Sequence, residues 1–244
     1  MRVVIVGGGI SGLSAAWYLH KQTPKASIVL LEQQPRLGGW IETRREKGFF
    51  FEMGPRTFLI SRCEMLLQLI RELGLEQELV FSDPSAKTRY LFYRGKLRSI
   101  PSLWPQLLRA GMQDLFAPRG SGKEESIYEF ACRRFGTTAA ELFFDAMSKG
   151  VFTGDIRKLS VDACFPFLHQ WEAKYRSIAW GMWRQKKQSR GLFTLRGGMH
   201  RLIEELAKMP IEIHTGCKAQ SIQADRVIAN DRAWEADLII AALP

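Results

Sequence analysis

The stretch Val3-Val-Ile-Val-Gly-Gly-Gly-Ile-Ser-Gly12 decides the fold of this chain. The β-branched run before Gly7 predicts a buried strand, and residues 13–20 predict a helix directly after the glycines. Gly7 permits a tight turn, Gly9 lets a pyrophosphate approach the backbone, and Gly12 lets the helix pack closely on the strand. The pattern predicts that a nucleotide phosphate binds free N–H groups at the positive end of the helix dipole.

A second apolar run supports this interpretation. Ser27-Ile-Val-Leu-Leu31 predicts another strand and ends in Glu32, about 20 residues beyond Gly12, where dinucleotide-binding domains place a carboxylate on the ribose hydroxyls. The alternative for Glu32 is a solvated charge at a strand end. An acid here disfavours a 2′-phosphate, so NAD or FAD is preferred to NADP.

Length and composition bound the class of protein. The 244 residues suffice for a substantial core, in one large or two small domains. Apolar residues make up 46% and charged residues 25%, which is typical of globular proteins. No stretch approaches the ~20 apolar residues of a membrane-spanning helix, and no signal-peptide pattern precedes the first strand. From these features we expect a cytoplasmic protein.

The chain is basic, with 35 Lys and Arg against 25 Asp and Glu and a formal net charge of +10. This balance suits an anionic partner: nucleic acid, an acidic membrane surface or a polyanionic substrate. No nucleic-acid motif accompanies it, so we expect no nucleic-acid partner. Residues 171–190 mix aromatic and basic side chains, which fits an interfacial helix, an anion site, or a half-buried helix with a solvated basic face.

The sequence contains no motif for metal binding or for thiol chemistry. Cysteines are scattered, without a Cys-x-x-Cys pair or a histidine at ligand spacing, so we expect free, mostly buried thiols and no metal site. The four cysteines are Cys63, Cys132, Cys164 and Cys217. His169 and His200 are isolated and are expected in solvent or in the core.

The remaining patterns outline an insertion between two parts of one domain. From residue 101 to 192 helical patterns dominate, clearest at 127–135 and 139–147, with a polar segment at 117–125 that predicts a mobile loop. Before and at the start of this region, the sequence predicts a helix over 63–73 and a hairpin over 90–100 with the turn Arg94-Gly95. After it, a helix follows Leu195-Arg-Gly-Gly-Met199, and strands are predicted at 211–214, 218–223 and 226–229. A last strand within 236–244 is predicted to return to the first sheet.

The stretch Gln33-Gln-Pro-Arg36-Leu-Gly38-Gly39-Trp40 is by itself a turn. Behind a dinucleotide fingerprint it resembles the Arg-x-Gly-Gly element of flavoproteins with two dinucleotide-binding domains, which lies along the cofactor pyrophosphate. NAD dehydrogenases have no counterpart, so this resemblance implies FAD as the cofactor.

The chain as a whole resembles the protoporphyrinogen oxidases, oxygen-dependent flavoenzymes of haem biosynthesis. The match rests on the glycines at 7–12, on Glu32, on Arg36-Leu-Gly-Gly-Trp40, on Gly54-Pro-Arg56, on Lys149-Gly-Val-Phe-Thr-Gly-Asp155 with the following Cys164-Phe-Pro-Phe, and on the stretches 195–199 and 236–244. The first three are shared with amine oxidases and carotenoid desaturases. Members of this family are considerably longer, and the chain stops at Pro244 where a strand reaches the ligand, so we expect a truncated chain.

The resemblance implies an α/β fold with a Rossmann-like FAD-binding domain in residues 1–82 and 193–244, interrupted by a mostly helical substrate- and membrane-binding insertion in 83–192. It implies hydride transfer from a porphyrinogen to the flavin, with oxygen as acceptor and no catalytic dyad. The implied cofactor contacts are Gly7, Gly8, Gly9, Ile10, Ser11, Gly12, Glu32, Gln33, Arg36, Gly38, Gly39, Trp40, Gly54, Pro55, Arg56, Thr57 and Ala219. The implied substrate contacts are Arg56, which would bind a propionate, Gly150 in a turn that leaves room for a flat molecule, and Phe152.

The same resemblance leaves three functions open. The substrate is protoporphyrinogen or coproporphyrinogen, and a non-catalytic FAD-binding protein is the alternative of another class. It also implies peripheral contact with an anionic membrane, at the inner face of the cell membrane, and a homodimer when the chain is complete.

Overall fold

A computed structural model describes residues 1–83, 89–184 and 191–243 of the chain. The chain divides into two compact units: unit 1 is Met1–Ser82 with Ser189–Pro244, and unit 2 is Asp83–Gln188. The sequence interpretation ended the insertion at residue 192. Leu192 instead begins a strand of unit 1, where it pairs with Leu59.

Unit 1 is built on a parallel sheet with the strand order β10-β2-β1-β14. Its strands are β1 (Arg2–Val6), β2 (Ser27–Leu31), β10 (Glu212–His214) and β14 (Leu238–Ala241). Every neighbouring pair is parallel, with Val3 beside both Ile28 and Leu238. Strand β1 is buried over nearly its whole length, as expected for a central strand covered on both faces. The predicted return of the last apolar run to this sheet is confirmed.

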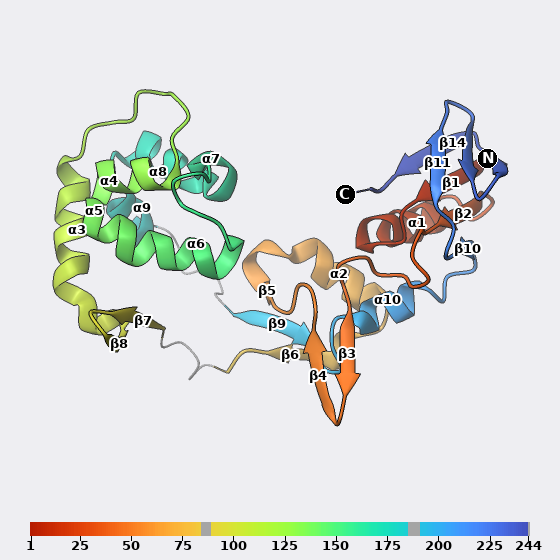
Figure 1. The fold of residues 1–244 in the computed structure, drawn as a ribbon, viewed down its shortest axis with the longest axis horizontal. Helices are drawn as coiled ribbons and strands as arrows, with labels where there is room; N and C mark the ends of the chain where they lie inside the picture. Colours follow the sequence, from red (N-terminus) through yellow and green to blue (C-terminus); the bar gives the residue numbers. More distant parts are fainter. Residues whose placement is uncertain (84–88, 185–190, 244) are drawn as a thin grey trace. The chain divides into compact units, whose positions relative to one another are not determined.

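Helix α1 (Ile10–Gln22) begins directly at the glycine turn, three residues earlier than predicted. Its buried residues Gly12, Leu13 and Ala16 face a core shared with α2 (Glu64–Glu72) and α10 (His200–Leu206). Figure 1 shows α1 and α10 close together although about 190 residues separate them, and the two helices are in contact. A strand, a helix on its face and a parallel sheet confirm the predicted α/β class.

A small antiparallel sheet covers the other face of β1. Its strands are β11 (Ala219–Ile222), β12 (Arg226–Ala229) and β13 (Arg232–Glu235). Trp234 of β13 is buried in a core with Val4 and Val6. The sequence analysis missed β13, although Asn230-Asp231, both with positive φ, form the two-residue turn that joins β12 to β13.

Three further segments complete unit 1. Strands β3 (Thr43–Glu46) and β4 (Phe49–Glu52) form a hairpin around Lys47-Gly48, and β5 (Phe58–Leu59), β9 (Leu192–Leu195) and β6 (Leu79–Phe81) form a small sheet. In that sheet β9 lies between β5 and β6, so the chain after unit 2 pairs with the chain before it. Short 3₁₀ turns, η1 (Ile60–Arg62) and η2 (Glu76–Glu78), connect them.

Unit 2 starts with the predicted hairpin and continues in helices. The hairpin is confirmed: β7 (Tyr90–Tyr93) and β8 (Lys96–Ser99) pair around Arg94-Gly95, both with positive φ. The other elements are η4 (Ile100–Leu103), α3 (Trp104–Phe116), α4 (Ile127–Phe135), α5 (Thr137–Ala139), η5 (Ala140–Phe144), α6 (Asp145–Phe152), α7 (Val161–Cys164), α8 (Pro166–Tyr175) and α9 (Ile178–Arg184).

Two helix predictions in unit 2 need correction. The helix predicted over 139–147 runs from 137 to 152 and contains the π-helical turn η5, so Gly150 lies inside α6 and not in a turn. The aromatic and basic segment 171–190 is not one helix, because Arg176 adopts a left-handed conformation between α8 and α9. Residues 185–190 of that segment, with Lys186, Lys187 and Arg190, lie outside the described residues.

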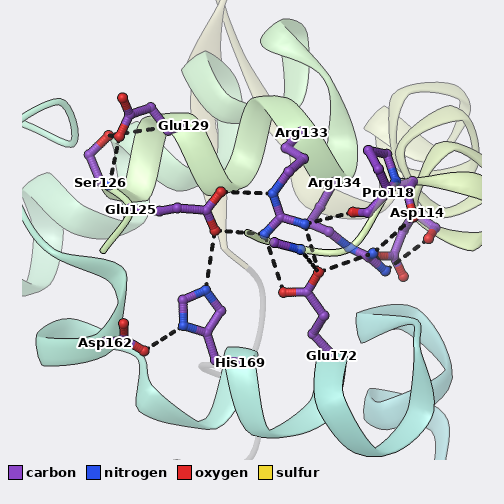
Figure 2. A network of polar contacts seen from close by, with 12 residues as sticks. Asp114, Pro118, Glu125, Ser126, Glu129, Arg133, Arg134, Asp162, His169 and Glu172 are labelled. Atoms are coloured by element: carbon purple, nitrogen blue, oxygen red, sulfur yellow. Dashed lines mark hydrogen bonds and ion pairs between the residues drawn. The ribbon is translucent and has the colours of Figure 1, made fainter. Parts of the chain in front are cut away.

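A buried network of charges joins the helices of unit 2 (Figure 2). Asp114 of α3 and Arg134 of α4 are both 0% exposed; the Arg134 Nε donates to Asp114 Oδ1 at 2.7 Å, and the Ser177 hydroxyl donates to Oδ2 at 2.6 Å. Arg133 pairs with Glu125 and with Glu172 of α8, each at 2.6 Å. The segment 117–125 is therefore tied to α4 and α8.

Helix α3 buries a charged side chain and exposes apolar ones, the reverse of the usual pattern for a surface helix. Asp114 and Ala110 face the interior of unit 2, and the opposite side is apolar and exposed. The exposed residues are Trp104, Leu107, Leu108, Met112, Leu115 and Phe116. In the described residues, no helix has the length and apolar character needed to cross a membrane.

The histidine and cysteine expectations also change in detail. His169 is neither free in solvent nor in an apolar core, because its Nδ1 lies 2.5 Å from Asp162 and its Nε2 3.3 Å from Glu125 (Figure 2). All four cysteines are free thiols, but only Cys217 is buried and the other three are partly exposed. The described residues contain no group of three or more His, Cys, Asp or Glu side chains arranged to hold a metal ion.

Candidate functional site: a glycine-lined cavity in unit 1

A cavity of about 1110 Å³ opens at the carboxyl ends of β1, β2 and β14 in unit 1. This is the end of a parallel sheet at which α/β proteins bind their ligands. Its wall comes from the glycine turn, the Arg36–Trp40 loop, β11 and α10. The lining residues are Val6, Gly7, Gly9, Ile10, Ser11, Leu31, Glu32, Gln33, Gln34, Arg36, Gly38, Gly39, Trp40, Ile41, Glu42, Met53, Pro55, Phe58, Leu66, Met199, Leu202, Cys217, Ala219, Gln220, Ser221, Ile222, Ala242 and Leu243.

The three glycines of the fingerprint have different environments. A Cβ on Gly12 would lie 1.9 Å from the Gly7 carbonyl oxygen, and one on Gly7 would lie 2.4 Å from the Ala242 carbonyl oxygen. These two glycines are therefore required by the packing of the chain on itself. A Cβ on Gly9 would meet nothing within 4 Å, and its φ of −74° suits any residue. Since Gly9 lines the cavity, the space over it is available to a ligand.

The N-terminus of α1 supplies anion-binding groups at this place. Gly9 is the N-cap residue and no side chain caps the helix. The first helical N–H groups therefore have no partner from a capping side chain, and Ile10 and Ser11 line the cavity. Free N–H groups at the positive end of a thirteen-residue helix form a binding site for a phosphate.

Glu32 is held rigidly at the end of β2. It is 7% exposed, its Oε2 accepts the Gly8 N–H at 2.6 Å, and its Oε1 accepts the Gln34 N–H at 2.7 Å. The alternative of a solvated strand-end charge is wrong. Each carboxylate oxygen can accept a further hydrogen bond, and Glu32 lines the cavity, so it can still bind a ribose hydroxyl.

The Arg36 side chain stabilises the loop that carries it. Its guanidinium donates to the carbonyl oxygen of Gly39 at 2.9 Å and lies 3.1 Å from the Glu42 carboxylate. Glu42 also accepts a hydrogen bond from Arg44 at 2.6 Å. That bond, together with the charge of Arg36, lowers the pKa of Glu42 below its usual value. Glu42 therefore stays ionised and keeps the guanidinium of Arg36 at the cavity wall.

The Gly38-Gly39 pair lies against the fingerprint itself. The Gly38 N–H donates to the Gly8 carbonyl at 2.8 Å, and Gly9 and Gly38 form an isolated parallel bridge. A Cβ on Gly39 would lie 3.3 Å from the Gly9 Cα. The two glycine segments thus form one continuous backbone surface along the cavity, with α10 behind it.

A further part of the lining is apolar, and we call it the apolar compartment. It consists of Met53, Phe58, Leu66, Leu202 of α10 and Met199, the N-cap residue of α10. A cavity with a phosphate-binding helix end, a carboxylate for a ribose and an apolar compartment matches the chemical parts of a flavin dinucleotide.

Most of the predicted cofactor residues line this cavity, and some do not. Those that line it are Gly7, Gly9, Ile10, Ser11, Glu32, Gln33, Arg36, Gly38, Gly39, Trp40, Pro55 and Ala219. Gly8 and Gly12 are buried and do not line the cavity. A Cβ on Gly8 would press on Leu37 and Glu32. Gly54, Arg56 and Thr57 also lie outside the lining, and a Cβ on Gly54 would meet the Trp40 carbonyl oxygen at 1.8 Å.

The predicted substrate residues lie in different units. Arg56 is exposed, next to the lining residue Pro55 in unit 1, and has no ion pair within the described part of the chain. Gly150 and Phe152 belong to α6 of unit 2. The Phe152 ring packs on Phe165 with 5.4 Å between ring centroids, and the position over Gly150 is open, because a Cβ there would meet nothing within 4 Å.

The sequence analysis expected the end of the last strand to reach the ligand but did not name the lining residues there. Ala242 and Leu243 follow β14, and the carboxyl end of a parallel strand is where ligands bind. Met199 was noted only as part of a turn. Residues such as Cys217, Leu66 and Phe58 reach the cavity through tertiary packing, for which the sequence has no local signal.

Comparison with known proteins agrees with this geometry. Residues 10–244 match the family described as "Flavin containing amine oxidoreductase". The chain is 35% identical to protoporphyrinogen oxidase of Bos taurus, over 99% of this chain and 59% of the relative. It is 32% identical to coproporphyrinogen III oxidase of Bacillus subtilis, over 85% of this chain and 50% of the relative.

A solved structure shows the same fold. A crystal structure of a protein of the protoporphyrinogen oxidase type from Exiguobacterium sp. superimposes with a TM-score of 0.81 and 28% sequence identity, over 100% of this chain and 59% of that one. The chain thus spans between 50% and 59% of the length of these relatives. The cofactor of the family is FAD, and the glycine-lined space over Gly9 fits its pyrophosphate. This chain belongs to the flavin-containing amine oxidoreductase family and is a member of the protoporphyrinogen oxidase type.

Proposed function

We propose that this chain is the FAD-binding part of a flavoenzyme that oxidises a porphyrinogen with oxygen as the final acceptor. The observation that carries the proposal is the cavity wall at Gly9, where neither backbone conformation nor packing requires a glycine but a bound pyrophosphate would. The relatives named protoporphyrinogen oxidase and coproporphyrinogen III oxidase support the substrate class.

In this proposal FAD supplies a hydride acceptor, and the chain supplies its placement. The N–H groups at the start of α1 bind the pyrophosphate, and the Glu32 carboxylate accepts hydrogen bonds from the ribose hydroxyls. Met199 and Leu202 exclude water from the apolar compartment of the cavity. No acid–base pair is needed among these residues, because the redox chemistry belongs to the cofactor.

Two features support a flat, anionic substrate. Arg56 offers a solvent-exposed guanidinium, which can bind a propionate through two parallel hydrogen bonds. On α6 the backbone at Gly150 is open, and Val151 and Phe152 beside it are exposed apolar side chains. Each feature suits one part of such a substrate: the guanidinium suits a carboxylate arm, and the open apolar stretch of α6 suits an apolar face.

The test of this proposal compares protoporphyrinogen with coproporphyrinogen III as substrates. The bovine relative is named for protoporphyrinogen and the Bacillus subtilis relative for coproporphyrinogen III, which carries more carboxylates. We propose protoporphyrinogen as the substrate, because the bovine match covers more of the chain at higher identity. Full-length protein loaded with FAD is mixed anaerobically with each porphyrinogen, and flavin absorbance is followed.

Faster bleaching with protoporphyrinogen, followed by recovery of the absorbance when oxygen is admitted, is the expected result. Faster bleaching with coproporphyrinogen would reassign the substrate. A loaded protein that bleaches with neither would contradict the enzymatic proposal and favour a non-catalytic FAD-binding protein.

We also propose peripheral contact with an anionic membrane, through the exposed apolar side of α3. Trp104, Leu108 and Leu115 lie on one side of α3 and are 52–62% exposed, and a formal net charge of +10 favours an anionic surface. Leu108→Glu should reduce co-sedimentation with vesicles containing phosphatidylserine. Unchanged co-sedimentation would contradict the contact through α3.

A further inference from the structure

A pair of polar side chains outside the cavity fixes the position of its apolar wall. Thr43 is the first residue of β3 and Glu52 the last residue of β4, and they face each other across the hairpin. The Thr43 hydroxyl donates to the Glu52 carboxylate at 3.0 Å. We call Thr43 and Glu52 the hairpin pair.

The hairpin pair caps a helix that is distant in sequence. Glu52 Oε1 accepts the Met199 N–H at 2.8 Å, and the Thr43 Oγ1 accepts the His200 N–H at 3.1 Å. Helix α10 has no capping side chain of its own and no acidic residue in its first turn. Its first N–H groups are therefore satisfied from the hairpin, about 150 residues away, with a carboxylate at the positive end of the helix.

The turn before α10 is shaped to receive this pair. Gly198 has a φ of +94°, and a Cβ on it would lie 2.4 Å from the Thr43 hydroxyl and 2.6 Å from Glu52 Oε1. The glycine is required both by the backbone conformation and by the close approach of the two side chains. Arg45 of β3 adds a hydrogen bond to the Gly197 carbonyl at 2.8 Å.

By capping α10, the hairpin pair fixes the position of part of the cavity wall. Met199, the N-cap residue of α10, and Leu202 within the helix are both 0% exposed and line the apolar compartment. Ile203, one residue further on, packs behind Gly38, where a Cβ would lie 3.2 Å from it. A shift of α10 would therefore move both the apolar wall and the support of the glycine surface that faces the pyrophosphate.

We propose that Thr43 and Glu52 are positioning residues for FAD, acting through α10 on Met199 and Leu202. The proposal rests on the proposed function, because it needs FAD in the cavity. Neither Thr43 nor Glu52 lines the cavity, so a contribution to FAD affinity would pass through the helix. This distinguishes the pair from residues that touch the cofactor.

The test compares FAD binding with fold stability in matched variants. Thr43→Val keeps the size of the side chain but removes the hydroxyl, and Thr43→Ser keeps the hydroxyl. We expect Thr43→Val to raise the dissociation constant for FAD about tenfold, and Thr43→Ser to restore most of the affinity. Glu52→Gln should weaken binding in the same direction, and it decides the question if Thr43→Val does not fold.

The control is a second ion pair that holds α10 but does not line the cavity. Glu78 pairs with Arg201 of α10 at 2.9 Å, and neither residue lines the cavity. Glu78→Gln should lower the melting temperature of the FAD-free protein, as Thr43→Val does, without changing the dissociation constant for FAD or the visible spectrum of the bound flavin. The two effects separate positioning of the wall from general stability.

Each outcome has a definite meaning. Wild-type FAD affinity and flavin spectrum in Thr43→Val and Glu52→Gln overturn the positioning role but leave the proposed function intact. An equal loss of FAD affinity in Glu78→Gln shows that the effect is general loosening and also overturns it. A wild-type protein that takes up no FAD contradicts the proposed function and this inference together.

Discussion

At the scale of single residues, one motif contains glycines with two kinds of role. Gly7 and Gly12 are needed because the chain packs on itself, whereas Gly9 has open space over its Cα and an ordinary φ. The Gly-x-Gly-x-x-Gly spacing predicted all three from sequence. It also assigned Gly7 and Gly12 to the turn and the helix packing, and Gly9 to the pyrophosphate. It could not show that the Ala242 carbonyl, just after the last strand, closes the space at Gly7.

Because of this difference, substitutions at Gly9 and Gly12 should affect FAD binding and fold stability differently. Gly9→Val should weaken FAD binding by at least a hundredfold, about 2.7 kcal/mol, because its side chain would occupy the place of the pyrophosphate. The melting temperature of the FAD-free protein should change little.

Gly12→Ala is the matched variant and should lower that melting temperature strongly, since its Cβ would lie 1.9 Å from a carbonyl oxygen. Differential scanning calorimetry and FAD titration of both variants check the contrast. A Gly9→Val protein that binds FAD normally would show that the pyrophosphate lies elsewhere.

Arg36 illustrates a limit of the sequence analysis at this scale. The residue was identified correctly as part of the cavity wall, but its guanidinium is engaged with Gly39 and Glu42. A one-dimensional pattern identifies the residue type that a loop needs. It does not show whether the charge faces the ligand or the loop's own carbonyl groups.

At the scale of elements, α1 and α2 are joined through one carboxylate. Glu72 of α2 accepts hydrogen bonds from Gln68 at 2.8 Å, from Trp17 of α1 at 3.1 Å and from Lys21 at 3.0 Å. These hydrogen bonds lower the pKa of Glu72 from 4.5 to about 2. The charged form therefore holds the two helices together.

The sign of the pH dependence follows from this lowered pKa. The contribution of Glu72 to the free energy of unfolding is complete above pH 4.5 and is lost as the pH falls toward about 2. The melting temperature of Glu72→Gln should be below that of the wild type at pH 7, and the difference should shrink between pH 4.5 and pH 2.

Glu46→Gln, at an exposed residue whose ion pair with Lys47 is long, serves as the control and should change little at any pH. A difference between Glu72→Gln and wild type that stays constant with pH would contradict the assigned role of Glu72.

In unit 2 the helices are held by a buried ion pair. Asp114→Asn removes the nearer charged partner of the Arg134 guanidinium, which is 0% exposed, and leaves only Glu172 at 3.5 Å. Removing one partner of such a pair costs about 3–5 kcal/mol. Asp145→Asn, which removes the exposed pair with Lys149, should cost only about 0.3–0.5 kcal/mol. Equal melting temperatures for the two variants would show that the buried pair is not what stabilises these helices.

Unit 2 also shows which elements the sequence predicts poorly. The β7–β8 hairpin was predicted through its Arg94-Gly95 turn, and α4 through its apolar spacing. The π-helical turn at Ala140–Phe144 and the break at Arg176 have no such signal, because tertiary packing determines them. The network of Figure 2 could not be predicted, because its partners lie up to 44 residues apart.

At the scale of the whole molecule, the α/β class and the cofactor were predictable from the first forty residues. Strand, glycine turn, helix, second strand and Glu32 are consecutive, so their mutual placement depends on local structure. The apolar half of the cavity was not predictable, because it is assembled from α2, α10 and β4–β5 residues that are far apart in the chain.

FAD binding in the cavity of unit 1 is tested most directly by one titration. Purified protein, cleared of flavin, is titrated with FAD while flavin fluorescence and visible absorbance are followed, with Gly9→Val as the reference. We predict saturable binding of one FAD per wild-type chain and at least a hundredfold weaker binding by the variant. Wild-type protein that takes up no FAD, or takes it up no better than Gly9→Val, would contradict the account.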